Sequence, residues 1–135
     1  MTTSTRRTKP ATSHVSIVSS NAETLDGLQT YFSNVGVAAR CTRAIKNFDA
    51  IAAERVTVAV IFPDDYVRAD VIALLRKLRR SRPHFLAILI TREPRQFAAI
   101  AETDGFSPTS VLLPKPSFGW DILDAIRAHA SRGQT

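Results

Sequence analysis

The sequence predicts a single α/β domain in which a parallel sheet carries helices on both faces. Short runs of apolar and β-branched residues alternate with longer segments whose apolar residues recur every three or four positions. This alternation is typical of strands that are joined by helices. Two of the runs, 56–62 and 85–90, are almost wholly apolar, as expected for strands that are buried on both faces.

The composition is that of one globular domain. The chain has 135 residues, of which 44% are hydrophobic and 22% charged. No apolar run approaches the ~20 residues that span a bilayer, and 1–13 lacks the apolar core of a secretory signal. Cys41 is the only cysteine, which excludes a disulfide framework. We therefore expect a cytoplasmic protein that does not contact membranes.

The chain is basic, with a formal net charge of +6. A dense cluster of cations spans Arg76 to Arg82, and a weaker one lies at Arg6, Arg7 and Lys9. Cations near the end of a helix complement its dipole, which is one explanation of the first cluster. A patch that binds phosphates is the other.

In the first half of the chain, local signals agree with the alternating pattern. Ser20 or Asn21 can cap a helix, and Gly36 occupies the position where a helix commonly ends. The run at 37–42 is more polar than the other strands, which favours a place near the edge of the sheet. After a disordered basic tail, we expect strands at 14–18, 37–42 and 56–62 and helices at 22–34 and 43–54.

The second half repeats the pattern. Pro94 suits the first turn of a helix that ends at Asp104-Gly105, and Ser117 is positioned to cap the last helix. Trp120 is expected to pack the first turn of that last helix against the sheet, with a partner contact as the alternative. The remaining expected elements are a helix at 67–81 and strands at 85–90 and 111–113.

Five strand–helix units fit a three-layer sandwich of the flavodoxin-like type, with strand order 2-1-3-4-5. The expected domain covers 14–131, between the tail at 1–13 and a fray at 132–135. In such sheets, sites form beyond the carboxyl ends of the strands. Asp64 and Asp65 directly follow the central strand, and so they lie where a site is expected.

Two motifs point to a family. Lys115-Pro116 follows a short apolar strand just before the final helix, and Thr91 ends the fourth strand. With these residues and its element lengths, the chain from about 14 to 131 resembles the receiver domain of bacterial two-component response regulators. The resemblance implies an acidic pair after strand one that holds Mg²⁺, a phosphoacceptor aspartate at the end of strand three, and an aromatic residue in strand five.

The chain departs from this pattern at the positions that matter for phosphoryl transfer. Ser19 and Ser20 replace the acidic pair, so we expect no Mg²⁺ and no other cofactor. Counting from the neighbouring elements places Phe62 or Pro63 at the acceptor position, and only a shift of one residue delivers Asp64. Arg92 stands where receivers have a small residue.

The sequence therefore predicts a degenerate acceptor pocket. Asp64 and Asp65 are expected to be structural anchors that are neutralised by Lys115 or by the Arg92 guanidinium. Thr91 is either a strand-end hydroxyl that caps nearby backbone or a remnant of the phosphate site. The residues assigned to the pocket are Ser19, Ser20, Asp64, Asp65, Thr91, Arg92 and Lys115.

On this reading the chain is not an enzyme but a stand-alone pseudo-receiver, a protein-interaction module in bacterial signalling that acts without phosphorylation. The resemblance implies docking of a protein partner through helix four, strand five and helix five, or through helix one; a homodimer is also considered. Leu112 takes the place of the strand-five aromatic. The residues assigned to this face are Arg95, Gln96, Ala99, Leu112, Phe118, Trp120 and Asp121.

Three alternatives remain. The first is a conventional phosphorelay response regulator that is phosphorylated on Asp64. The second is a protein that binds nucleic acid through Arg76 to Arg82, which we do not expect because no helix-turn-helix segment accompanies the domain. The third is flavin binding by the loop Ser19-Ser20-Asn21, which a yellow purified protein would indicate.

Overall fold

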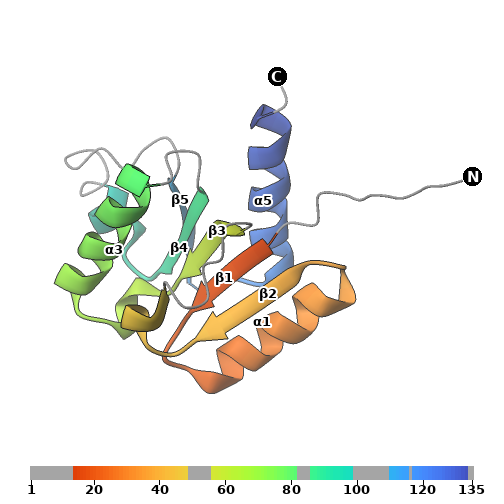
Figure 1. Ribbon diagram of the computed structural model, residues 1–135, viewed down its shortest axis with the longest axis horizontal. Helices are drawn as coiled ribbons and strands as arrows, with labels where there is room; N and C mark the ends of the chain where they lie inside the picture. The colour runs from red at the N-terminus through yellow and green to blue at the C-terminus, as the bar shows by residue number, and fades with distance from the viewer. Residues whose placement is uncertain (1–13, 49–55, 82–85, 99–109, 116, 134–135) are drawn as a thin grey trace, which may run out of the picture.

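The computed structural model describes residues 14–48, 56–81, 86–98, 110–115 and 117–133 (Figure 1). Its centre is a sheet of five parallel strands in the order β2-β1-β3-β4-β5. This confirms the predicted class and strand order. The strands are β1 (His14–Val18), β2 (Ala38–Thr42), β3 (Val56–Ile61), β4 (Leu86–Thr91) and β5 (Ser110–Pro114).

Helical segments follow the strands in the order that the sequence predicts. The α-helices are α1 (Ala22–Asn34), α3 (Arg68–Ser81) and α5 (Gly119–Gly133), and the short 3-10 turns are η2 (Ile45–Asn47) and η3 (Pro63–Asp65). A further helical segment, 94–98, begins at Pro94 as predicted. The predicted tail at 1–13 lies outside the described residues, as do the second half of the second expected helix, 49–54, and the end of the fourth.

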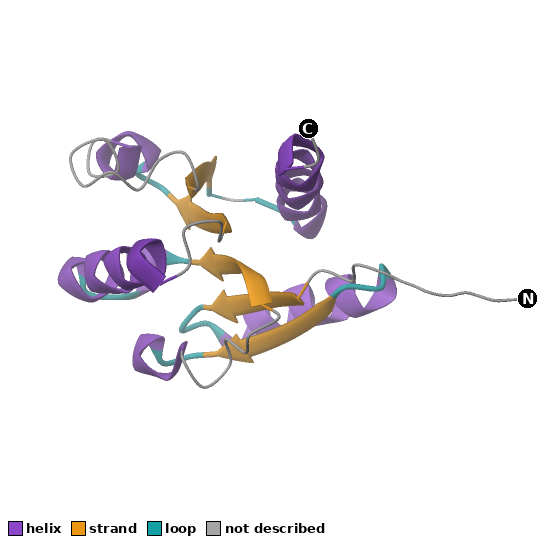
Figure 2. Ribbon diagram, turned by 45° about the horizontal axis from the view of Figure 1, so that its top comes forward, coloured by secondary structure: helices purple, strands orange, loops and turns teal. Residues whose placement is uncertain are grey.

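Helices lie on both faces of the sheet (Figure 2). The sheet separates two hydrophobic cores, because successive side chains of a strand point to opposite faces. Val18, Ala59 and Ile61 face α3 and η2, whereas Ile17 and Val60 face α1 and α5. Every residue of β4 is buried, which explains its uninterrupted apolar sequence. The more polar β2 lies at one edge of the sheet, as its sequence predicts.

The two ends of α1 follow the signals in the sequence. The side-chain oxygen of Asn21 accepts a hydrogen bond of 3.1 Å from the backbone N–H of Thr24, which caps the first turn. Gly36, just beyond the helix, has a φ of 79°. Only glycine adopts this left-handed conformation without steric penalty, so the helix ends here.

The start of α5 differs from the prediction. Ser117 does not cap the helix; its hydroxyl donates to the carbonyl of Pro114. The helix begins at Gly119, and the backbone N–H of Phe118 donates at 2.8 Å to the carboxylate of Asp121. The cap is therefore supplied from inside the first turn, by a residue whose charge also complements the helix dipole.

Trp120 does not pack against the sheet, so that prediction is wrong. Its side chain is 55% exposed and stacks on Phe118, with ring centroids 4.6 Å apart and planes inclined by 14°. The buried positions of the helix are Gly119, Ile122, Leu123 and Ile126. Because these buried positions define the inner face of the helix, Trp120 lies on the outer face. Its ring and that of Phe118 remain accessible there.

Candidate functional site

The candidate site lies at the carboxyl edge of the sheet, where β1, β3 and β4 end side by side. Phe62 and Pro63 are buried, and η3 then turns the chain so that two consecutive carboxylates face different neighbours. Asp65 faces the end of β1, and Asp64 faces the end of β4. The sequence thus predicted correctly that the two carboxylates lie at the carboxyl edge of the sheet. In the fold, each of them contacts the end of a different strand.

Asp65 joins the turn after β3 to the loop after β1. One of its carboxylate oxygens accepts a hydrogen bond of 2.9 Å from the Ser19 hydroxyl and one of 3.0 Å from the backbone N–H of Ser20. Ser19 is only 1% exposed, and its oxygen in turn accepts from the backbone N–H of Asn21. Hydrogen bonds of this kind to a charged acceptor are stronger than those between neutral groups.

Asp64 joins the same turn to the end of β4. The buried hydroxyl of Thr91 donates to one carboxylate oxygen at 2.6 Å, and the backbone N–H of Arg92 donates to the other at 2.8 Å. The Thr91 oxygen also accepts from the backbone N–H of Glu93. A hydroxyl and an amide at the end of this strand therefore converge on one anion, which belongs to the chain itself.

The predicted ion pairs are replaced by other contacts. The ammonium group of Lys115 lies 5.8 Å from the centre of the Phe62 ring, a cation–π arrangement. Its backbone N–H donates to the carbonyl of Thr91. Within the described part of the chain, the carboxylates are held by hydroxyls and backbone amides, and neither Lys115 nor the Arg92 guanidinium forms an ion pair with them.

Tyr66 forms a second layer beside the acidic turn. Its hydroxyl donates at 2.8 Å to the backbone carbonyl of Arg43, and the Nε of Arg43 donates at 3.0 Å to the carbonyl of Ser20. Burial raises the pKa of Tyr66 to about 12, the Asp65 carboxylate adds to the rise, and Arg43 opposes it. Neither residue was predicted from the sequence to belong to the site, although Tyr66 directly follows the acidic pair.

A cavity of about 470 Å³ opens beside Asp64. The guanidinium of Arg68 lies 5.9 Å from the centre of the Phe97 ring, and both residues line this cavity. Arg92 lines it as well, and it contacts Asp64 through its backbone N–H. The other lining residues are Pro63, Tyr66 and Glu93.

The donor set does not fit Mg²⁺, the metal that the receiver fold implies. Mg²⁺ prefers an octahedral shell of oxygens that includes carboxylates. Ser19 and Ser20 contribute no charge, and the Asp65 oxygen that faces them already accepts two hydrogen bonds. Among the described residues, no three His, Cys, Asp or Glu side chains are grouped to hold a metal ion.

The predicted interaction face is only partly available. Arg95, Phe118 and Trp120 are exposed, whereas Leu112 is partly buried against the core on the α3 side. The carbonyl oxygen of the Gln96 side chain is buried without a hydrogen-bond partner. Asp121 caps α5. Ala99 lies outside the described residues.

Comparison with known proteins identifies the fold. No protein-family model and no curated protein matches the chain. Among solved structures, it is similar to the signal receiver domain of an HD domain-containing protein from Pseudomonas fluorescens Pf-5, with 21% identity and a TM-score of 0.74 over 90% of this chain and 97% of that one. A CheY-like response regulator receiver domain protein from Methanospirillum hungatei JF-1 is 18% identical, with a TM-score of 0.73 over 92% and 98%.

An orphan response regulator from H. pylori is also similar, with 8% identity and a TM-score of 0.69 over 87% of this chain and 95% of the other. The chain therefore has the fold of response-regulator receiver domains. No described helix is long and apolar enough to cross a membrane.

Proposed function

We propose that the chain is a pseudo-receiver, a cytoplasmic protein-interaction module that works without phosphorylation, without Mg²⁺ and without a catalytic step. One observation carries the proposal. The hydroxyl of Thr91 and the amide of Arg92, which together form an anion site at the end of β4, are already satisfied by the carboxylate of Asp64. The site holds an internal anion, and so an added phosphoryl group is not needed to fill it.

The neighbouring contacts support the same proposal. Phosphoryl transfer to a carboxylate depends on cations that neutralise the developing charge. Here two serines stand where the metal ligands of a phosphorylated receiver would be, and the Lys115 ammonium lies over the Phe62 ring. The acidic turn is held to β1 and β4 by neutral donors, an arrangement suited to a fixed conformation.

For the partner we propose a protein surface that covers the exposed aromatic pair of Phe118 and Trp120. Their stacked rings are 53% and 55% exposed at the start of α5. Aromatic residues are enriched at the centres of protein interfaces, where their burial contributes much of the binding energy. Arg95, exposed in the helical segment 94–98, belongs to the same proposed face.

Exposure to beryllofluoride with Mg²⁺ tests the proposal. We expect the amide spectrum of the ¹⁵N-labelled chain to stay unchanged, because Ser19 and Ser20 in the loop after β1 supply no carboxylate for the metal and Asp64 is engaged by Thr91. A saturable change that is lost in Asp64→Asn would instead establish the phosphorelay alternative.

A matched variant sharpens this test. Ser20→Asp returns one carboxylate to the loop after β1, where the serine side chain is exposed. If missing charge is what prevents metal binding, this variant gains a response to Mg²⁺ that Asp26→Asn, an unrelated exposed change, does not produce. A wild-type response as large as that of Ser20→Asp would contradict the assigned reason.

A further inference from the structure

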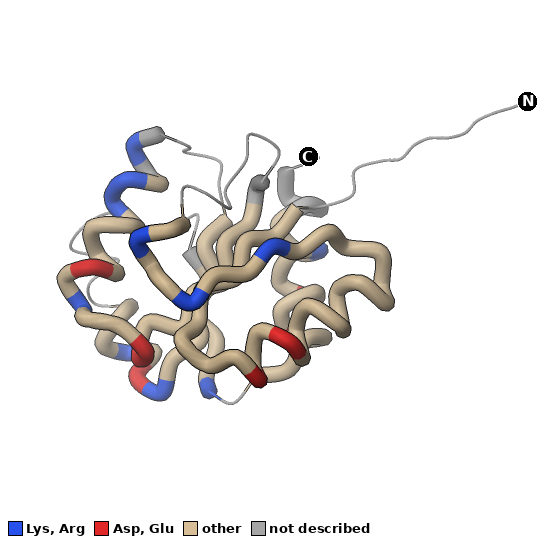
Figure 3. Tube along the Cα trace, turned by 60° about the horizontal axis from the view of Figure 1, so that its bottom comes forward, with Lys and Arg blue, Asp and Glu red and all other residues tan. Residues whose placement is uncertain are grey.

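Six exposed cations that are scattered in the sequence lie on the side of the sheet that carries η2 and α3. Figure 3 shows the basic positions of β2 and η2 running toward those of α3. We call this set the basic strip. It consists of Arg40, Arg43, Lys46, Arg76, Lys77 and Arg80, all of which are exposed.

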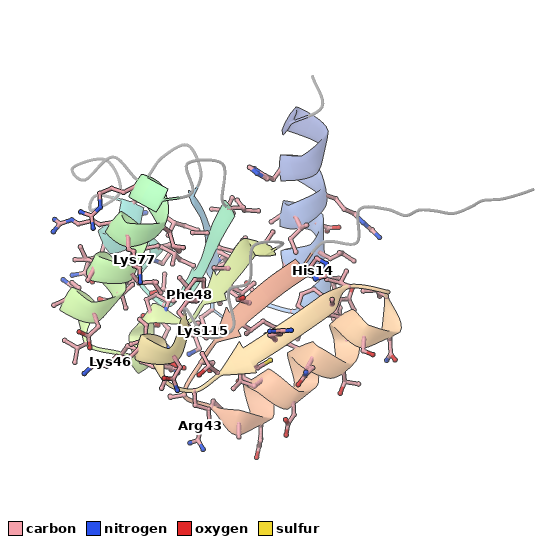
Figure 4. The ribbon with its side chains drawn as sticks, in the orientation of Figure 1. His14, Arg43, Lys46, Phe48, Lys77 and Lys115 are labelled. Atoms are coloured by element: carbon pink, nitrogen blue, oxygen red, sulfur yellow. The ribbon has the colours of Figure 1, made fainter. Side chains whose placement is uncertain are left out.

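The fold brings the two halves of the basic strip together. In β2, Ala39 and Cys41 pack against the core on the α1 side, so the alternation of side chains directs Arg40 to the opposite face, that of η2 and α3. Lys46 and Lys77 line one cavity of about 210 Å³ between η2 and α3 (Figure 4). The strip is therefore continuous from the edge strand to the helix.

Within α3, the cations share the outer surface. Arg76 and Arg80 are four residues apart and Lys77 and Arg80 three apart, spacings that make side chains neighbours on a helix. Val71, Leu74, Leu75 and Leu78 of the same helix are buried in the core.

Among the described residues, two carboxylates lie close to the basic strip. Asp70 lines the same cavity as Lys46 and Lys77. Asp65 lies beside Tyr66, whose hydroxyl donates a hydrogen bond to the backbone carbonyl of Arg43. Within the described part of the chain, the six cations of the strip outnumber the carboxylates beside it. The whole chain has the same character, with a net charge of +6 and an isoelectric point of about 10.2.

The chemistry of this surface favours a polyanion over a protein partner. Protein interfaces depend on buried aromatic and apolar anchors. In the described part of the chain, the large exposed apolar side chains are Val35, Val67, Phe118 and Trp120, none of which belongs to β2, η2 or the second half of α3. Phe48, in the cavity wall, is only 2% exposed.

We propose that the basic strip binds the phosphate backbone of nucleic acid without reading base sequence. Cations clustered on one face of a strongly basic domain are the electrostatic footprint of such binding. This activity is separate from the proposed protein-interaction function, since it uses other elements of the fold. From the sequence we did not expect nucleic-acid binding. That expectation considered the cations of α3 alone, without the cations of β2 and η2 that folding places beside them.

Fluorescence anisotropy with a labelled duplex of random sequence tests the inference. If four phosphates are neutralised, affinity is expected to fall roughly a hundredfold between about 50 and 200 mM salt. Duplexes of unrelated sequence are expected to bind equally well. Absence of binding to duplex and single-stranded probes at low salt would overturn the proposal.

Variants locate the binding surface. Arg40→Gln combined with Arg80→Gln removes two cations from the basic strip and is expected to reduce the salt slope by about two. Arg127→Glu, at an exposed position of α5, changes the net charge by the same amount and is expected to leave the slope unchanged. Equal losses in both variants would show that bulk charge, and not the strip, is responsible.

Competition separates nucleic acid from an acidic protein surface. Polyglutamate presents carboxylates without the geometry of a phosphate backbone. It is expected to displace the duplex only at a large excess of charge. Displacement at equal charge concentration would identify an acidic protein partner and overturn the assignment to nucleic acid.

Discussion

Asp64 and Asp65 show how two adjacent identical residues come to do different structural work. The turn η3 directs one carboxylate to β4 and the other to the loop after β1. Between them they accept four hydrogen bonds from Ser19, Ser20, Thr91 and Arg92. The residues at this edge therefore stabilise one arrangement of three strand ends.

Removal of the Asp65 carboxylate tests this anchoring role. In Asp65→Ala the buried Ser19 hydroxyl and the Ser20 amide lose their acceptor. We expect the free energy of unfolding to fall by about 2 kcal/mol, because hydrogen bonds to a charged group are lost and a buried donor is left unsatisfied. Urea unfolding measures the change. Asp124→Ala, at an exposed position of α5, is the control, and a loss of the same size there would contradict the explanation.

The ionisation of Tyr66 is a second test at the scale of one residue. Its pKa is raised to about 12 by burial and by Asp65, which means that the folded chain favours the neutral phenol. The stabilisation is complete below the ordinary pKa of about 10 and is lost as the pH rises through 12. In Tyr31→Phe, where Tyr66 is the only tyrosine, the phenolate absorbance is expected to appear near pH 12. A midpoint near 10 would show that the phenol is not buried.

At the scale of the elements, α1 and α5 meet where Gly119 lies against Tyr31. A Cβ atom at Gly119 would be 2.5 Å from the Tyr31 ring, closer than any side-chain contact allows. We expect Gly119→Ala to destabilise the chain by about 1–3 kcal/mol through overpacking. Gly27→Ala, in α1 with open space around its Cβ position, is expected to stabilise it by about 0.5–1 kcal/mol.

Thermal unfolding of the two glycine variants measures this difference in sign. The second substitution serves as a control, because both replace a helical glycine by alanine. If both variants gained stability, the Tyr31 ring would have to move aside at little cost. The combination of Gly119→Ala with Tyr31→Leu is expected to recover part of the loss.

The elements also show how much of the site can be predicted from the sequence. The apolar runs determine which strands are central, and parallel strands place Ser19, Asp65 and Thr91 at one edge. The sequence does not determine which donor each carboxylate meets, since that depends on the direction of a single 3-10 turn. The Lys115 prediction was wrong for a related reason: a long cation can lie over an aromatic ring as readily as beside a carboxylate.

Longer-range packing was least accessible from the sequence. Trp120 was expected to pack against the sheet because large aromatic side chains contribute much apolar surface to a core. The helix begins at Gly119, which packs on Tyr31. With Gly119 facing inward, the next residue, Trp120, faces outward. The basic strip likewise depends on contact between η2 and α3, which are separated by more than 20 residues.

At the scale of the whole molecule, one sheet serves two cores and separates two surfaces. The core on the α3 side and the core on the α1 and α5 side are built on opposite faces of the same strands. Loss of the helices from either face would expose strands that also form the core on the other face. We therefore expect the basic strip and the aromatic pair of Phe118 and Trp120 to belong to one cooperative unit, although they lie on different sides of it.

This arrangement predicts that damage to either core lowers the stability of both. Leu74→Ala on the α3 side and Phe32→Ala on the α1 side are each expected to reduce the free energy of unfolding by about 3–4 kcal/mol, because both side chains are buried. Trp120, the only tryptophan, reports on the α5 side by its fluorescence, while circular dichroism reports on all helices. In Leu74→Ala the two signals should still change at the same urea concentration, as for a two-state transition. If α3 unfolded first while Trp120 kept its native emission, the two faces would be independent.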